Sequence, residues 1–429
     1  MQNQCVSRWF SGIFVLALVG LLSGCSTDFD GNGGGEAGSS WQKSYSNDRF
    51  ANLVALDGDD NLYSATTLHM SAYGPYLKLF KTDSDGEKIW NRQITVGTDS
   101  DRILSLSFSA KMRLDSAENI GIIGTSQAIE RTADTKINYL SGTHKAFFVK
   151  TSSDGTKLWE YIHENTDGES YGKSLALDNS GNYYLTGIET YDSYKKRTFV
   201  IKLTSEGNQV FAKTYPLSGN VISQNDIAFD GSSTLYVYGA HEHTIQDGNA
   251  GRTVWGLSLL RIDTNGNTIW QKTYEDDQHD CSVSGMAMDA SGNLFLASVR
   301  TAARLSERTL SEGSIFKINS AGSLVWSKKF AESSEGLDIN AVAVDTGGAV
   351  RVGGWIRGEL AGFDNADGNR DPYWVKMSAN GDILETNQLS APQGSDINAI
   401  SIGHSGTVYY SGFGKLEGES NYSFLIKKP

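Results

Sequence analysis

A pattern of two β-hairpins repeats along most of the chain. The first hairpin is an alternation of apolar residues that ends in Asp, a polar turn and a second alternating run, as in LALDNSGNYYLTG at residues 175–187. Alternation with a period of two predicts strands, and Gly or Asn between them suits a tight turn. Gly403 holds the turn position in the seventh unit. The other six turn positions are Asp57, Asp115, Asp178, Asp230, Asp289 and Asp345.

The second hairpin ends in a Gly followed four residues later by an aromatic residue, as in FFVKTSSDGTKLW at residues 147–159. The aromatic position is Trp90 in the first unit and Glu385 in the sixth, so five periods cover 295 residues and the mean period is 59 residues. The two hairpins of a unit predict a four-stranded antiparallel sheet. Such a period, without helices, is typical of a β-propeller blade.

The composition supports an all-β chain. It has 47 Gly and 5 Pro, and no long stretch has the apolar period of a helix. Seven first hairpins predict seven blades, but the chain ends before the outer strand of the last one. The sequence WQKSY at 41–45 matches the outer strand WQKTY at 270–274 in all but one residue. We therefore expect residues 41–429 to form a single seven-bladed domain, closed by the N-terminal strand pairing with the C-terminal blade.

Residues 1–24 have the features of a secretory signal. Arg8 precedes a 14-residue apolar run at 9–22, which is too short to span a bilayer. The following LSGC, which ends at Cys25, resembles the lipobox of bacterial lipoproteins. This resemblance implies cleavage before Cys25, acylation of this Cys and, with Ser26 after it, export to the outer membrane. An ordinary signal with a chance Cys is the alternative. Residues 25–40 are then the lipidated Cys and a flexible Gly/Ser-rich tether.

The repeat units resemble the bacterial β-propeller repeat (SBBP-like) lipoproteins, whose units combine Asp-x-x-Gly-Asn-x-Tyr with Phe-Val-x-Lys and Gly-x-x-x-Trp. The resemblance covers residues 41–429 and implies architecture rather than chemistry. GTKLW at 155–159 is more distantly similar to the quinone-cofactor-type propeller lipoproteins. Both resemblances imply a bacterial cell envelope location.

The connections between the two hairpins of a unit vary in length and sequence, whereas the turns within hairpins are short. In a propeller these connections lie on one face, here called the long-loop face. Binding residues usually occupy variable loops on a rigid scaffold, so we expect binding on this face, with tolerated insertions as the alternative. The longest loops span residues 126–145, 240–255, 301–313 and 355–372.

Metal-ligating residue types gather in one of these loops and in the link leaving the same unit. His241, His243, Asp277 and His279 combine imidazoles with a carboxylate, which together can hold a divalent metal. A solvated polar loop without metal is the alternative. We predict no other cofactor.

Charge and cysteine content limit the partners. The net charge is −13, and removal of the leader with Arg8 gives −14, which opposes nucleic-acid binding. After cleavage Cys25 is acylated and Cys281 is the remaining thiol, so no internal disulfide is expected. The body should be a monomer, held at the membrane through its lipid.

The sequence favours a binding protein over an enzyme. No nucleophile elbow, His-Glu-x-x-His or phosphate-binding loop appears. The leading hypothesis is a lipid-anchored envelope propeller that binds a protein or glycan through its long-loop face. The alternatives are a propeller enzyme or quinone-cofactor protein that uses the central channel, and an accessory lipoprotein of outer-membrane assembly.

Overall fold

The computed structural model describes residues 40–45, 53–68, 76–97, 102–106, 111–131, 137–192, 195–216, 226–247, 250–274, 279–302, 310–360, 362–363, 368–391, 394–415 and 421–428. They belong to one compact unit, Gly38–Pro429. The predicted signal peptide (1–24), Cys25 and the tether up to residue 39 lie outside them. None of the described segments is a helix long and apolar enough to cross a membrane.

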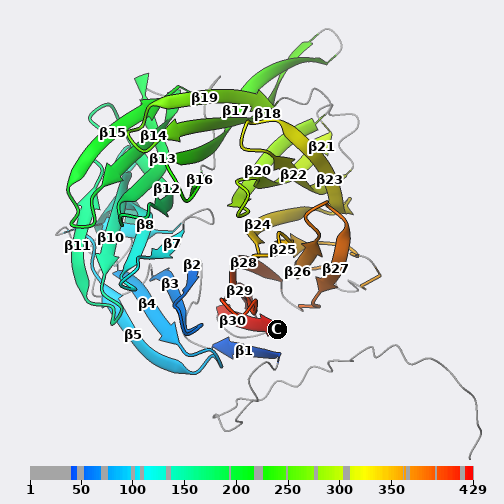
Figure 1. The fold of residues 1–429 in the computed structure, drawn as a ribbon, viewed down its shortest axis with the longest axis horizontal. Coiled ribbons are helices and arrows are strands. Elements are labelled where there is room, and N and C mark those ends of the chain that lie inside the picture. The colour runs from blue at the N-terminus through cyan, green and yellow to red at the C-terminus, as the bar shows by residue number, and fades with distance from the viewer. Residues whose placement is uncertain are drawn as a thin grey trace, which may run out of the picture. The chain divides into compact units, whose positions relative to one another are not determined.

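Seven antiparallel sheets form a ring of blades within this unit, as Figure 1 shows. Each innermost strand contacts the innermost strands of the two neighbouring blades. The innermost strands are β2 (Leu53–Leu56), β7 (Met112–Leu114), β12 (Ser170–Leu177), β16 (Asp226–Phe229), β20 (His279–Met288), β24 (Leu337–Val344) and β28 (Ser395–Ile402). The second strands are β3 (Leu62–Leu68), β8 (Ile120–Arg131), β13 (Tyr183–Tyr191), β17 (Thr234–Asp247), β21 (Leu294–Ala302), β25 (Val350–Ile356) and β29 (Val408–Lys415).

The outer half of each blade is the second hairpin of the repeat. The third strands are β4 (Tyr76–Thr82), β10 (Lys145–Thr151), β14 (Lys195–Leu203), β18 (Ala250–Asp263), β22 (Ser311–Ile318), β26 (Asp371–Met377) and β30 (Asn421–Lys428). The outermost strands are β5 (Lys88–Ile94), β11 (Lys157–Ile162), β15 (Gln209–Tyr215), β19 (Thr268–Tyr274), β23 (Leu324–Ser333), β27 (Ile383–Gln388) and β1 (Trp41–Tyr45). Two short strands, β6 (Arg102–Ser105) and β9 (Ile137–Tyr139), also pair with β8.

The ring closes through its two chain ends, as predicted. β1 pairs antiparallel with β30, in a register that places Trp41 opposite Lys427 and Tyr45 opposite Ser423. The seventh blade therefore has its fourth strand from the N-terminal side of the chain (Figure 1). Pairing with β1 covers the edge of β30 that would otherwise be open to other chains.

Two recurring features of the repeat stabilise the fold. At the turn position, Asp178 Oδ1 accepts hydrogen bonds from the backbone N–H of Ser180 at 2.9 Å and of Asn182 at 3.0 Å, which fixes the first hairpin. Gly207 has a φ of +92°, and a Cβ there would lie 2.8 Å from Trp159 Cδ2 of the preceding blade. The repeated Trp residues thus pack between neighbouring blades.

One predicted loop is regular secondary structure. β17 and β18 pair continuously from Thr234 and Asp263 to Asp247 and Ala250, so residues 240–255 extend the hairpin beyond the ring rather than forming an irregular loop (Figure 1). Backbone hydrogen bonds between the two long strands explain the difference, because they satisfy the polar groups of the insertion.

Candidate functional site

A small pocket lies where the sixth and seventh blades meet on the long-loop face. We call it the rim pocket; its volume is about 190 Å³. Asp338 and Asp396 are each the second residue of an innermost strand, β24 and β28. Trp355 is the next-to-last residue of the second strand of the sixth blade, and Arg370 immediately precedes its third strand. The predicted loop 355–372 therefore begins in this pocket and returns to it. The pocket is completed by Ser284, Ile339 and Asn340.

The charged groups of the rim pocket are held by the fold. The Arg370 guanidinium carbon lies 4.4 Å from the centre of the Trp355 ring, and Arg370 Nη1 lies 3.9 Å from Asp396 Oδ2. Asp338 Oδ1 accepts a hydrogen bond of 2.9 Å from the backbone N–H of Ile339. One cation thus faces two carboxylates beside an aromatic ring.

Burial changes the acidity of both carboxylates. It raises the pKa of Asp338, against the hydrogen bond from Ile339 and the attraction of Arg370. It also raises the pKa of Asp396, to about 6, where Arg370 opposes the shift and the charge of Asp338 adds to it. Burial disfavours the ionised form of both carboxyl groups. Each group can accept hydrogen bonds when it is charged and can donate one when it is protonated.

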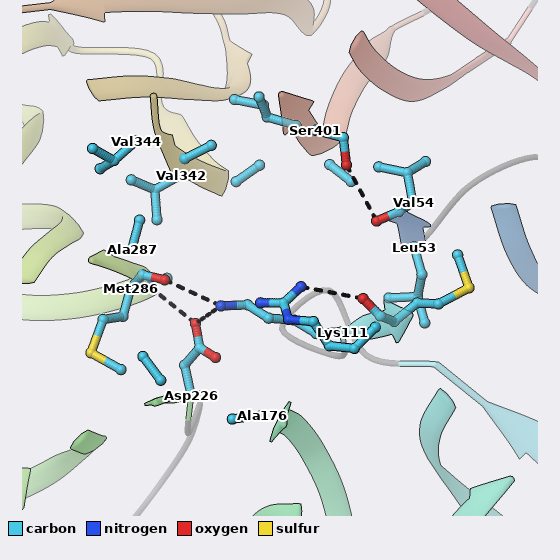
Figure 2. A pocket seen from close by; sticks show the side chains of 18 of the residues that line it. Leu53, Val54, Lys111, Ala176, Asp226, Met286, Ala287, Val342, Val344 and Ser401 are labelled. Carbon is cyan, nitrogen blue, oxygen red and sulfur yellow. Dashed lines mark hydrogen bonds and ion pairs between the residues drawn. The ribbon is translucent and has the colours of Figure 1, made fainter. Parts of the chain in front are cut away.

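The ring encloses a central channel with a cavity of about 510 Å³, lined by residues of all seven innermost strands or the residues beside them. Figure 2 shows Lys111 reaching across this channel to the carboxylate of Asp226, and the Lys111 ammonium also donates to the Met286 carbonyl at 3.1 Å. Ser284 and Asn340 line both this cavity and the rim pocket, so the two spaces adjoin.

Two histidine–glutamate pairs lie near the third blade. His144 Nδ1 is 2.5 Å from Glu169 Oε1, and His163 Nε2 is 2.8 Å from Glu189 Oε2. Arg197 Nε donates to the other oxygen of Glu189 at 2.7 Å. These pairs satisfy each other's hydrogen bonds, which indicates a structural role.

The predicted metal residues are only partly within the described residues. His241 and His243 lie on β17, with ring centres 5.7 Å apart, and a Cβ at Gly256 would meet both rings. His241 is buried, and its Nδ1 lies 3.0 Å from Ser258 Oγ. Asp277 and the side chain of His279 lie outside the described residues. Among those that are described, no three His, Cys, Asp or Glu side chains form a metal-binding group. The four-residue metal site stays a prediction.

The other predicted binding loops differ in how far the structure describes them. Of the loop 126–145, the described part contains β9, which pairs with β8. Most of the loop 301–313 lies outside the described residues, as does the middle of 355–372. Cys281 is buried.

The sequence reasoning missed Asp338 and Asp396, and also the channel residues Lys111, Arg113 and Asp226. The repeat could have pointed to Asp338 and Asp396. Asp338 stands seven residues before the turn position Asp345, and Asp396 stands seven residues before the turn position Gly403. Equal offsets in neighbouring units place side chains at the same level of adjacent blades.

Comparison with known proteins shows the fold. No family model and no curated protein sequence matches the chain. Among solved structures, an ulvan lyase of a polysaccharide lyase family is similar with a TM-score of 0.52 and 10% identity, over 86% of this chain and 90% of that one. An α-L-arabinofuranosidase from Fusarium graminearum has a TM-score of 0.44 and 7% identity, over 91% and 97% of the two chains.

A third similar structure is the β-propeller domain of the trilobed protease from Pyrococcus furiosus, with a TM-score of 0.45 and 9% identity over 89% of this chain and 97% of that one. At such identities a likeness concerns the fold alone. The described strands show that the chain is an all-β, seven-bladed β-propeller of four-stranded antiparallel blades.

Proposed function

We propose that this protein is a lipid-anchored propeller of the bacterial cell envelope that binds a glycan in the rim pocket. The observation that carries the proposal is the convergence of Asp338, Trp355, Arg370 and Asp396 in one pocket of about 190 Å³ on the long-loop face. Carboxylates and a guanidinium pair with the hydroxyl groups of a sugar, and the indole supplies an apolar wall. The space suits a group about as large as one sugar ring.

Binding by purified protein tests this proposal. Affinity electrophoresis in gels that contain neutral or acidic bacterial polysaccharides should show retardation by at least one of them. Trp355→Ala and Asp396→Asn should each weaken the retardation about tenfold or more, because a bidentate hydrogen bond or an aromatic wall is lost. Asp59→Asn, an exposed residue of the opposite face, is the control. If the pocket variants are retarded as much as the wild type, the rim pocket is not the glycan site. If no polysaccharide retards the protein and a protein partner is captured instead, the ligand is a protein and not a glycan.

A second candidate function is cleavage of a glycan in the same pocket. The observation in its favour is the neighbouring pair of carboxyl groups, one of which has its pKa raised to about 6 by burial, as suits a general acid. Incubation with the polysaccharide that binds best, followed by analysis of reducing ends, distinguishes the two functions. Reducing ends formed by the wild type but not by Asp396→Asn would make the protein an enzyme.

The anchor is a separate part of the proposal, supported by the LSGC sequence and the short apolar run. Several acyl chains on Cys25 hold a protein stably at a membrane where one would not. Labelled palmitate should enter the wild type and not Cys25→Ser, and the variant should leave the membrane fraction. Wild-type protein that remains unlabelled and soluble after export would refute the anchor while leaving the glycan site untouched. The family resemblance and the outer-membrane location belong to the same proposal.

A further inference from the structure

One charged side chain in the channel breaks the repeat at a position that is otherwise small. The residue two before the turn position is small in six of the seven units, which suits the place where innermost strands converge. In the second blade this position is Arg113. The six small residues are Ala55, Ala176, Ala228, Ala287, Ala343 and Ser401. A guanidinium at this level has no equivalent in the other blades.

The position four residues before the turn position carries an ion pair between two blades. Lys111 belongs to the second blade, Ser174 to the third and Asp226 to the fourth, and three of the other four units have Gly285, Ala341 and Ala399 there. The buried carboxylate of Asp226 accepts from the Lys111 ammonium and from Ser174 Oγ at 2.5 Å. It also accepts from the backbone N–H of Ile227 and of Met286, at 2.8 and 3.1 Å. The two oxygens of Asp226 therefore already accept four hydrogen bonds.

Arg113 is the cation of the channel that has no ion pair among the described residues. Its side chain is exposed and lines the cavity, and the bond that the described residues provide is Nη1 to the Met112 carbonyl at 3.2 Å. The charged residues that line the cavity are Lys111, Arg113 and Asp226, which sum to +1. This positive centre lies inside a protein of net charge −13.

Apolar side chains outnumber polar ones around this charge, while polar and apolar atoms share the exposed surface of the cavity about equally. Val54, Val342, Val344 and Ile400 line the same cavity, together with Ser and Asn side chains. Burial lowers the pKa of Lys111, and the charge of Arg113 lowers it further, against the attraction of Asp226. An added negative charge in the channel would stabilise both cations.

We propose that the central channel binds a small organic carboxylate, with the carboxylate group on the Arg113 guanidinium and an apolar body against the surrounding strands. A guanidinium offers two parallel N–H donors that match the two oxygens of a carboxylate. The apolar side chains in the walls favour a carboxylate with a hydrocarbon body over a fully hydrated inorganic anion, because they cannot replace the water that such an anion loses. This site is independent of the rim pocket residues proposed for the glycan.

Calorimetric titration at low ionic strength tests the site, with hexanoate as the probe. Hexanamide has the same body without the charge, and inorganic phosphate has the charge without the body. We expect hexanoate to bind, hexanamide and phosphate to bind at least tenfold more weakly, and added NaCl to weaken hexanoate binding. Arg113→Met keeps an apolar stem of similar length and should reduce hexanoate affinity about tenfold or more.

Arg92→Ala is the matched control, because Arg92 lies on the outermost strand of the first blade, away from the channel. It should bind hexanoate like the wild type. Since Arg113 makes one hydrogen bond to its own neighbour, Arg113→Met should also melt at or above the wild-type temperature, which shows that it is folded. Equal hexanoate affinity in the wild type and Arg113→Met, no hexanoate binding, or tighter binding of phosphate would each overturn the proposal.

Discussion

Lys427, in the last strand of the chain, donates a hydrogen bond of 2.9 Å to the carbonyl of Ser84 in the first blade. Equivalent bonds join consecutive blades elsewhere: the ammonium groups of Lys150, Lys202 and Lys317 donate to the carbonyls of Ser205, Thr264 and Ala379. In each case a third-strand Lys reaches the outer turn of the next blade. The ring is therefore closed by the same contact that joins its other blades, and not by β1 alone.

We expect Lys427→Met to lower the free energy of unfolding by about 1–2 kcal/mol, since the Ser84 carbonyl loses its charged donor and keeps the longer hydrogen bond of 3.4 Å from the Tyr409 hydroxyl. Lys376→Met is the matched control. Lys376 holds the equivalent place in β26, but the seventh blade has no outer turn, because its fourth strand comes from the other end of the chain. Urea unfolding of both variants measures the difference. Equal losses would mean that the bond to Ser84 does not contribute to closure.

Removal of residues 41–45 should destabilise the whole ring. The deletion uncovers the edge of β30 and removes the pairing that completes the seventh blade. Calorimetry should show one cooperative transition, lowered by roughly 5 °C or more. A truncated protein that melts like the intact one would show that β1 is not needed for closure.

Gly207→Ala should cost about 2–3 kcal/mol of stability. The new Cβ adds the strain of a positive φ to a clash with the Trp159 ring at 2.8 Å. Gly231→Ala separates the two effects, because Gly231 has a φ of +78° and nothing within 4 Å of the added Cβ. We expect this control to cost about 1 kcal/mol. Chemical denaturation gives both values, and equal costs would mean that the Trp ring yields without penalty.

The architecture could be predicted because each repeat unit carries local information. The turn Asp, the Gly and the Trp of a hairpin contact residues of the same unit or of the next one, so one unit predicts its neighbours. The seventh turn position shows the limit. Gly403 lacks the Asp carboxylate, and Asp60 of the first blade takes over, accepting from His404 N–H at 3.0 Å and Ser405 Oγ at 2.9 Å. This replacement requires ring closure, which no single unit specifies.

The channel and the rim pocket depend on the same global geometry. Lys111 and Asp226 are 115 residues apart and belong to the second and fourth blades, so the repeat alone does not pair them. Arg370 and Asp396 meet where a long loop returns to the next blade. The variability of the loop 355–372 allowed it to be predicted as a binding loop, whereas nothing in the sequence analysis identified Asp338 and Asp396 on the innermost strands as its partners.

Glu189→Gln should lower stability at neutral pH and remove part of its acid dependence. Burial alone would raise the pKa of Glu189, but the hydrogen bonds from His163 and Arg197 outweigh it and hold the pKa below its usual value. The resulting stability is present above pH 4.5 and is lost as the pH falls through the lower folded value.

Urea unfolding of Glu189→Gln should therefore show a loss of about 1–3 kcal/mol at pH 7 that shrinks below pH 4. Glu164→Gln is the control, because Glu164 is 65% exposed and its pair with Lys145 should contribute about 0–1 kcal/mol. A loss in Glu189→Gln that stays constant with pH would assign the effect to packing rather than to charge.

Asp396→Asn should make the protein more stable above pH 6 while it weakens glycan binding. Burial raises the pKa of Asp396 from 3.8 to about 6, so between these values the folded protein keeps a proton that the unfolded chain releases. Stability therefore falls as the pH rises through this window, and the full cost persists at higher pH. Asn cannot ionise, so at pH 8 the variant should be more stable by about 1–3 kcal/mol, and near pH 4 it should equal the wild type.

Urea midpoints at the two pH values, with Asp59→Asn as control, measure this difference in stability. A variant that is no more stable at pH 8 than at pH 4, relative to the wild type, would show that Asp396 ionises without cost and that the rim pocket is fully hydrated.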